Sequence, residues 1–264
     1  MRQARPSPPT TEPRTPLSAV AIIPARYGSS RFPGKPLADL CGRPLIEHVY
    51  RRTAATPGLR DVIVATDDAR IADVVHGFGG RAVMTRSDHP SGTDRLAEAA
   101  AALDADIVVN VQGDEPLIEP AMIETALRPF SARADVVMTT LRRPLPDLEA
   151  FLSPHVVKVV VDRHDVALYF SRAPIPFVRD GRLDRVPAGA WQHIGLYAYR
   201  RACLLGLAAL PPTALELAES LEQLRALEHG IRIVAPDTPF VSVGVDTPED
   251  LDRVRRLMET HSLR

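Results

Sequence analysis

The first half of the chain alternates short apolar runs with amphipathic segments. The apolar runs predict buried strands over residues 19–25, 61–66, 81–84 and 106–111. The segments between them have helical spacing and predict helices over residues 44–56, 68–77 and 91–103. The last of these has a Ser or Thr N-cap and an acidic first turn, both typical of a helix start. Strands that alternate with helices in this way predict a wound, largely parallel sheet.

The second half has a less regular pattern. It predicts strands over residues 135–141, 156–161, 166–170, 193–199, 231–235 and 241–245, and a polar loop over 179–189. The clearest helix is predicted for residues 215–229, where Leu217, Leu221 and Leu224 would share one face. A final helix should begin at Thr247, with Pro248 in its first position and an acid three residues after the cap. Leu251, Val254 and Met258 would then face the core.

The chain begins with a stretch rich in proline, threonine and arginine. We expect residues 1–18 to be a disordered extension and residues 19–264 to form one domain. The stretch has no apolar core of the kind that secretory signals require. A late start codon or, less well supported by the pattern, a transit peptide would also explain it.

Composition narrows the class of protein. Lys and Arg total 32 against 33 for Asp and Glu, which argues against a dedicated nucleic-acid binder. No apolar run reaches the roughly 18 residues of a membrane span. Cys41 and Cys203 suit a reducing cytoplasm. In a chain with so much arginine, the two lysines, Lys35 and Lys158, mark positions where a compact ammonium group is favoured.

A basic loop with two glycines, residues 26–35, follows the first predicted strand. Loops at the carboxyl ends of strands bind ligands in open α/β sheets, and cations there can neutralise phosphate oxygens. The loop is not a Walker A motif, because five residues separate Gly28 from Gly34 and Pro36 follows the lysine. The dinucleotide fingerprint G-x-G-x-x-G is absent as well. A solvated basic loop is the alternative, and the position after a buried strand favours a ligand.

Acidic residues follow two other predicted strands. Asp114 lies in the sequence NVQGDEP after the fourth strand, and Asp246 lies between a predicted strand and the last helix. Carboxylates at strand ends are natural ligands of Mg²⁺. A simple turn would also explain Asp114. Complementing the helix dipole explains Glu249 and Asp250 better than it explains Asp246, which lies outside the helix.

A more scattered polar group could hold a polyhydroxylated acid. It comprises Arg172, His193, Glu222 and Gln223. For these residues ordinary structural roles are the stronger alternative, since a lone histidine on a strand is usually satisfied within the fold.

Taken together, the motifs resemble one family, the 3-deoxy-manno-octulosonate (Kdo) cytidylyltransferases. The resemblance starts with IPARYGSSRFPGKPL at 23–37 and covers about residues 19–258. Sialic-acid cytidylyltransferases are similar but lack the R-x-P-G-K-P-L ending. The departures are the extension before Ala19 and Ala214, where the family often has proline. The other matching segments are 63–67, 84–86, 91–95, 109–116, 157–160, 169–172, 193–197, 221–225 and 244–250.

The resemblance implies a fold and a reaction. The fold is α/β, a Rossmann-like wound and mostly parallel mixed sheet of the nucleotide-diphospho-sugar transferase (GT-A-like) type. The reaction transfers CMP from CTP to the anomeric hydroxyl of Kdo and releases pyrophosphate, with Mg²⁺ as cofactor. A homodimer is implied as well. The same chemistry on another acidic sugar, or nucleotide binding without catalysis, stays open as an alternative.

The resemblance also assigns roles to residues. Asp114 and Asp246 would bind the metal, and Arg31 and Lys35 would join them in catalysis. The other residues would divide between a nucleotide side and a sugar side. The nucleotide side would comprise Arg26, Ser29, Arg31, Lys35, Gln112 and Asp114, together with the 84–94 region. The sugar side would comprise Arg172, His193, Tyr197, Glu222 and Gln223.

Overall fold

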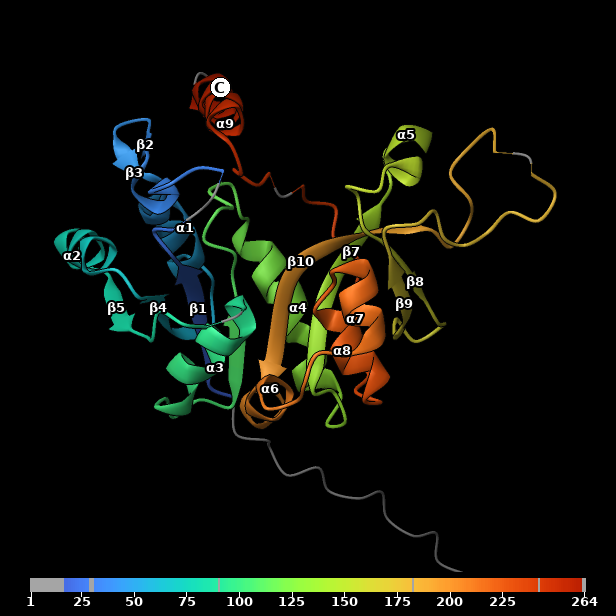
Figure 1. The fold of residues 1–264 in the computed structure, drawn as a ribbon, viewed down its shortest axis with the longest axis horizontal. Helices are drawn as coiled ribbons and strands as arrows, with labels where there is room; N and C mark the ends of the chain where they lie inside the picture. Colours follow the sequence, from blue (N-terminus) through green and yellow to red (C-terminus); the bar gives the residue numbers. More distant parts are fainter. Residues whose placement is uncertain (1–16, 29–30, 90, 182, 242, 263–264) are drawn as a thin grey trace, which may run out of the picture.

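A computed structural model describes residues 17–28, 31–89, 91–181, 183–241 and 243–262. Within these residues nine strands form one mixed sheet, in the order β11-β7-β10-β6-β1-β4-β5, with β8 and β9 attached through β10 (Figure 1). Most of the predicted extension, residues 1–16, lies outside the described residues. The chain already contacts the domain at Ser18, whose carbonyl oxygen accepts hydrogen bonds from the backbone of Asp106 and Ile107.

The parallel part of the sheet comes from the first half of the chain. Its strands are β1 (Ala19–Ala25), β4 (Leu59–Thr66), β5 (Arg81–Met84) and β6 (Ile107–Asn110). β4 and β6 both pair in parallel with β1, on opposite sides. The chain therefore moves outward from β1 to β5 and then returns to the other side of β1. The crevice between the carboxyl ends of β1 and β6 is the topological switch point at which such sheets bind ligands.

The rest of the sheet is mixed. It contains β7 (Met138–Pro144), β8 (Lys158–Val161), β9 (Ala167–Ser171), β10 (Trp191–Arg200) and β11 (Ile233–Val234). β10 is antiparallel to both β6 and β7. β8 joins β10 at only two positions, Val159 opposite Trp191 and Lys158 opposite Gln192. β8 and β9 thus form an arm at one flank of the sheet (Figure 1). A two-stranded hairpin, β2 (Asp39–Leu40) with β3 (Arg43–Pro44), stands apart.

Helices cover both faces of the sheet, as alternation along β1 requires. Ala21 and Ile23 face one core, and Val20 and Ile22 face the other. Helices α1 (Leu45–Ala54), α2 (Ala69–Gly77), α4 (Pro120–Ala132) and α9 (Pro248–Ser262) pack on the first side. Helices α3 (Gly92–Ala101), α6 (Arg201–Ala208) and α8 (Gln223–Glu228) pack on the second. The short helices η1 (Lys35–Leu37), α5 (Leu148–Leu152) and α7 (Ala214–Glu219) complete the set.

Most predicted elements are confirmed, and the mostly parallel mixed α/β sheet is the fold expected. The strands predicted at 19–25 and 81–84 have those bounds. Thr247 and Asp250 cap α9 reciprocally, since each backbone N–H donates to the other's side chain at 3.1–3.3 Å. Leu251 and Val254 are buried, as predicted.

Two predictions are wrong. Residues 215–229 form two short helices, α7 and α8, because Ser220 takes a left-handed conformation with φ 51° and turns the chain. Leu217 consequently points to solvent with 68% of its surface exposed, whereas Leu221 and Leu224 are buried. The described residues of 241–245 are irregular and form no strand. No helix was predicted for the segments that form α4, α5 and α6.

Candidate active site

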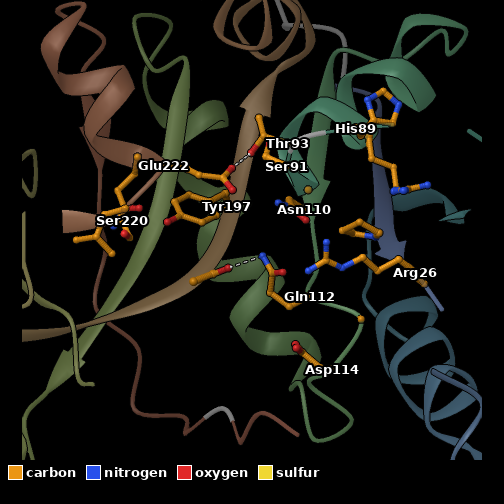
Figure 2. A pocket seen from close by; sticks show the side chains of 18 of the residues that line it. Arg26, His89, Ser91, Thr93, Asn110, Gln112, Asp114, Tyr197, Ser220 and Glu222 are labelled. Carbon is orange, nitrogen blue, oxygen red and sulfur yellow. Dashed lines mark hydrogen bonds between the residues drawn. The ribbon is translucent and has the colours of Figure 1, made fainter. Parts of the chain in front are cut away.

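A cavity of about 870 Å³ opens at the carboxyl ends of β1 and β6, at the switch point. Figure 2 shows its polar lining, which comes from both halves of the chain. On one side lie the loop after β1, the start of α3 and the loop after β6. On the other side lie β10, Arg172 and the junction between α7 and α8. Segments far apart in the sequence therefore line one cavity.

Lys35 brings the two predicted metal-binding acids together. Its Nζ lies 2.8 Å from Asp114 Oδ2 and 3.4 Å from Asp246 Oδ1. Arg31 adds a second cation, with NH2 3.1 Å from Asp246 Oδ2. The structure therefore gathers all four predicted catalytic residues in one charged cluster.

The backbone explains why Asp246 reaches this cluster. The N–H of Val245 donates to the carbonyl oxygen of Asp114 at 2.9 Å, which joins the loop before α9 to the loop after β6. Asp250 accepts hydrogen bonds from the backbone N–H groups of Asp246 and Thr247, both at 3.1 Å. Asp250 is thus occupied at the helix start, and the carboxylate of Asp246 is left to the cavity.

Gly113 allows the loop after β6 to pass close to the end of β1. A Cβ atom at this position would lie 2.7 Å from the carbonyl oxygen of Pro24, closer than real Cβ contacts. A side chain here would therefore push the loop that carries Asp114 away from β1.

The chemistry of the donor set fits a divalent cation. Asp114 and Asp246 already converge on one positive charge, and Mg²⁺ prefers carboxylate oxygens. Among the described residues no cluster of three or more His, Cys, Asp or Glu side chains could hold a metal. Two carboxylates therefore need further oxygen ligands, which Mg²⁺ usually takes from water and substrate phosphates.

The predicted nucleotide side is only partly described. Arg26 and Gln112 line the cavity, and Gln112 Nε2 donates to the carbonyl oxygen of Gly195 at 3.3 Å (Figure 2). Ser29 lies outside the described residues. From the 84–94 region, His89, Ser91, Gly92 and Thr93 line the cavity. The last three open α3, where backbone N–H groups favour anionic or hydroxylated ligands.

Glu222 and Gln223 lie where α8 meets the cavity. Glu222 Oε2 accepts a hydrogen bond from the Thr93 hydroxyl at 2.5 Å, which links this side to α3 (Figure 2). Gln223 is only 4% exposed, and its Nε2 has no hydrogen-bond partner among the described residues. A buried donor without a partner carries an energetic cost that a bound ligand can remove.

Arg172 follows β9 and lines the same cavity. Its Nε donates to Glu219 O at 2.8 Å, NH1 to Pro154 O at 3.2 Å and NH2 to Ser220 O at 3.4 Å. Since a guanidinium group has five N–H donors, these contacts leave two for a ligand. The predicted contact with a sugar carboxylate remains a prediction.

His193 and Tyr197 differ in position. Tyr197 lines the cavity. Burial and, to a smaller extent, the negative charge of Glu222 raise the pKa of the Tyr197 phenol, so the phenol stays protonated. His193 lies behind it, with ring centroids 5.6 Å apart, and is not one of the lining residues. Burial lowers the pKa of His193 to about 3, and its Nε2 lies 2.9 Å from the Thr140 hydroxyl. Direct contact between His193 and a sugar stays a prediction that this geometry does not support.

Sequence reasoning missed several lining residues. Asn110 is 5% exposed, and its Oδ1 has no partner within the described part of the chain. Asn110 is a polar residue at the end of an apolar strand, and this position in the sequence could have marked it as a site residue. Ser220 gave none, because serine rarely adopts the left-handed conformation that places it here. Tyr199 and Arg225 also line the cavity.

Comparisons with known proteins show the family to which the chain belongs. A cytidylyltransferase family model matches residues 20–233. A 3-deoxy-manno-octulosonate cytidylyltransferase from Trichlorobacter lovleyi is 56% identical over 250 residues, covering 92% of this chain and 99% of its own. The chain belongs to the 3-deoxy-manno-octulosonate cytidylyltransferase family. A further relative of the same name, from Geobacter metallireducens, is 56% identical over 245 residues, with 90% and 96% covered.

A solved structure extends the comparison within the 3-deoxy-manno-octulosonate cytidylyltransferases. It is a CMP:2-keto-3-deoxy-manno-octonic acid synthetase in complex with CTP. It aligns with a TM-score of 0.87 at 46% identity and covers 92% of this chain and 99% of its own.

Proposed function

We propose that this enzyme transfers CMP from CTP to the anomeric hydroxyl of Kdo, giving CMP-Kdo and pyrophosphate. The observation that supports this best is the convergence of Asp114 and Asp246 on Lys35 beside a cavity with polar groups on both sides. One side offers cations for phosphates, and the other offers Arg172, Glu222 and Gln223 for a polyhydroxylated acid.

The nucleotide side would act mainly through position and charge. Arg26, Arg31 and Lys35 would neutralise the triphosphate, which accumulates charge on its leaving pyrophosphate as the α-phosphorus is attacked. Gln112 would stay fixed by its bond to Gly195 while it contacts the nucleotide. In-line attack needs little covalent help from the protein, so holding the hydroxyl close to the phosphorus supplies much of the rate.

Asp114 and Asp246 would hold Mg²⁺, in line with the two-carboxylate donor set. Bound there, the metal supplies charge for the attacking and leaving oxygens. Lys35 would move from bridging the two acids to contacting phosphate, since its ammonium group and the metal compete for the same oxygens. Arg31, paired with Asp246, would change partner in the same way.

The sugar side would recognise an acid. Arg172 has two free donors for a carboxylate, and a guanidinium group binds carboxylates in a planar, paired geometry. Glu222 and Gln223 would contact hydroxyl groups, and the neutral phenol of Tyr197 would lie beside them. His193 would support Tyr197 from behind.

We further propose a homodimer that acts in the cytoplasm, where CTP is made. The β8–β9 arm, α5 and the loop after β9 lie at the same flank of the sheet (Figure 1). Phe177 in the loop after β9 is 85% exposed, Leu168 on β9 62% and Leu152 on α5 48%. Such side chains are typical of interfaces. Light scattering after size-exclusion chromatography would test the mass. No helix in the described ranges has the length and apolarity needed to cross a bilayer.

Pyrophosphate release from CTP with Mg²⁺ tests the function. Parallel reactions contain Kdo, sialic acid or no sugar. Release that depends on Kdo supports the proposal. Release with sialic acid alone would retain the nucleotide side and overturn the sugar assignment. Binding of CTP by folded protein without release under any condition would contradict catalysis.

A further inference from the structure

Lys158 is a buried charge that the proposed mechanism does not use. It lies on β8, is 0% exposed, and donates three hydrogen bonds to backbone carbonyl oxygens. The acceptors are Ser153 O at 2.7 Å, Val156 O at 2.6 Å and Arg172 O at 2.6 Å. All three ammonium hydrogens are therefore used, and they join the end of α5, the entry to β8 and the exit from β9.

This geometry needs lysine rather than arginine. Three converging carbonyls suit a compact ammonium group, whose three donors point in different directions. A planar guanidinium group presents its donors as a fork and needs more room, which a fully buried position lacks. The chain otherwise uses arginine almost throughout, so lysine here matches the constraint.

Both main-chain polar groups of Arg172 are held by charged side chains. Lys158 binds its carbonyl oxygen, and Glu219 Oε2 accepts its N–H at 2.9 Å. The other carboxylate oxygen of Glu219 accepts from the Ser171 hydroxyl at 2.5 Å. Glu219 supplies the opposite charge near Lys158, although no carboxylate bonds directly to Lys158 among the residues the structure describes.

The same contacts aim the guanidinium group. Arg172 donates to Pro154 O, next to the Ser153 carbonyl that Lys158 holds, and to Glu219 O and Ser220 O at the end of α7. Loss of Lys158 would free the 153–156 segment and the exit from β9 together. The side chain of Arg172 would then lose a defined position relative to the cavity.

We propose that Lys158 is a positioning residue for sugar-acid recognition: its ammonium group fixes the main chain at Arg172 and so presents the guanidinium group to the substrate carboxylate. The inference rests on the proposed function, in particular on Arg172 as the sugar-side cation. Lys158 does not touch the substrate, and Arg172 makes the contact.

A double-mutant cycle tests this. We would measure kcat and the KM for Kdo and for CTP in wild type, Lys158→Met, Arg172→Ala and the double variant. Lys158→Met should raise the KM for Kdo about tenfold or more and change the KM for CTP less than about twofold. In the Arg172→Ala background the same change should add less than about twofold, because residues acting through one contact are not additive.

Two further variants keep the test sharp. Lys158→Arg retains the charge but should not restore the KM for Kdo; full restoration would show that charge alone matters and would overturn the positioning role. Glu219→Gln loses the charge on the other side of Arg172 and should also raise the KM for Kdo selectively. It serves as the alternative if Lys158→Met does not fold.

Arg201→Met is the matched control. Arg201 also donates to two backbone carbonyls, of Ala100 at 2.8 Å and Ala101 at 2.6 Å, but does not line the cavity. It should lower the melting temperature without changing either KM. Equal rises in both KM values for Lys158→Met, or additive effects in the cycle, would overturn the inference. An unchanged KM for Kdo in Arg172→Ala would show that Arg172 does not bind the sugar and would overturn the inference. Wild type without Kdo-dependent turnover would overturn the proposed function itself.

Discussion

Lys35 Nζ lies 2.8 Å from Asp114 Oδ2, although 79 residues separate the two in the sequence. This ion pair brings the basic loop after β1 to the acid loop after β6, and Asp246 joins it from a third segment. Lys35 thus joins three segments of the chain through two carboxylates at the same ammonium group.

Asp114→Asn should reduce kcat by about 10²–10³-fold or more while the protein stays folded. The amide keeps the shape of the side chain but removes the charge that a cation needs. Steady-state turnover at saturating Mg²⁺ and CTP is the measurement, with circular dichroism as a check of folding. Asp135→Asn, in an exposed ion pair with Arg133, is the control and should retain activity. Near-wild-type turnover of Asp114→Asn would remove this residue from the metal site.

Chelation of divalent ions with EDTA should abolish pyrophosphate release, and added Mg²⁺ should restore it. Asp246→Asn should shift the Mg²⁺ titration to concentrations about tenfold higher or beyond, because one of two carboxylate ligands is lost. Activity is followed against free Mg²⁺ in both proteins. Identical titration curves would place the metal elsewhere.

His193 should make folding stability depend on pH. Its pKa is about 3 in the folded protein because of burial, against 6.5 when exposed. As pH falls below 6.5 the unfolded chain takes up a proton that the folded protein does not, so stability decreases until about pH 3. The slope is about 1.4 kcal/mol per pH unit, which amounts to about 2 kcal/mol at pH 5.

His193→Gln isolates this effect, since glutamine does not titrate and can still bond to Thr140. Urea unfolding at pH 7 and pH 5 should show wild type losing about 2 kcal/mol more than the variant between these values. Parallel losses would mean that His193 is protonated in the folded state.

The break between α7 and α8 predicts that Leu217 and Leu224, which would share one face of a single helix, contribute very differently to the free energy of unfolding. Leu217→Ser should change the free energy of unfolding by less than about 0.5 kcal/mol, because its side chain is mostly in solvent. Leu224→Ala should cost about 2–5 kcal/mol, because Leu224 is fully buried. The free energy of unfolding of both variants is measured with urea. Comparable losses would contradict the break and support a single helix over residues 215–229.

The central strands and the edge of the sheet that carries the site could be predicted from the local sequence pattern. Apolar runs located the central strands, and the order of strands and helices placed the loops after β1 and β6 at one edge. The position of Asp246 outside the last helix distinguished it from Asp250, which the structure assigns to the helix cap. This topology places Lys35 and Asp114 at one edge of the sheet, whereas the grouping of Asp246 with them was implied by the family resemblance.

Features set by tertiary contacts could not be predicted in this way. The leucine spacing around Ser220 is the same for one helix or two, and only packing selects the left-handed turn. A buried pair, Glu216 with Arg225 at 2.6 and 2.8 Å, holds α7 against α8 across that turn. His193 is partly buried in β10, as the alternation predicts, but the pattern did not show that its ring lies behind Tyr197. The scarcity of lysine singled out Lys158, but its three carbonyl partners, two in the 153–156 segment and one at Arg172, are set by tertiary contacts.

The β8–β9 arm meets the sheet at only two paired positions of β10, while Arg172 leaves from its end. The phosphate-side residues come from the parallel strands at the other side of the cavity. The arm is also anchored by the buried side chains of Val159 and Phe170 and by a bridge between Val166 and Val234. The two sides of the cavity thus belong to different parts of one packed domain, so a substitution at the end of the arm should change one side while the backbone of the other side keeps its place.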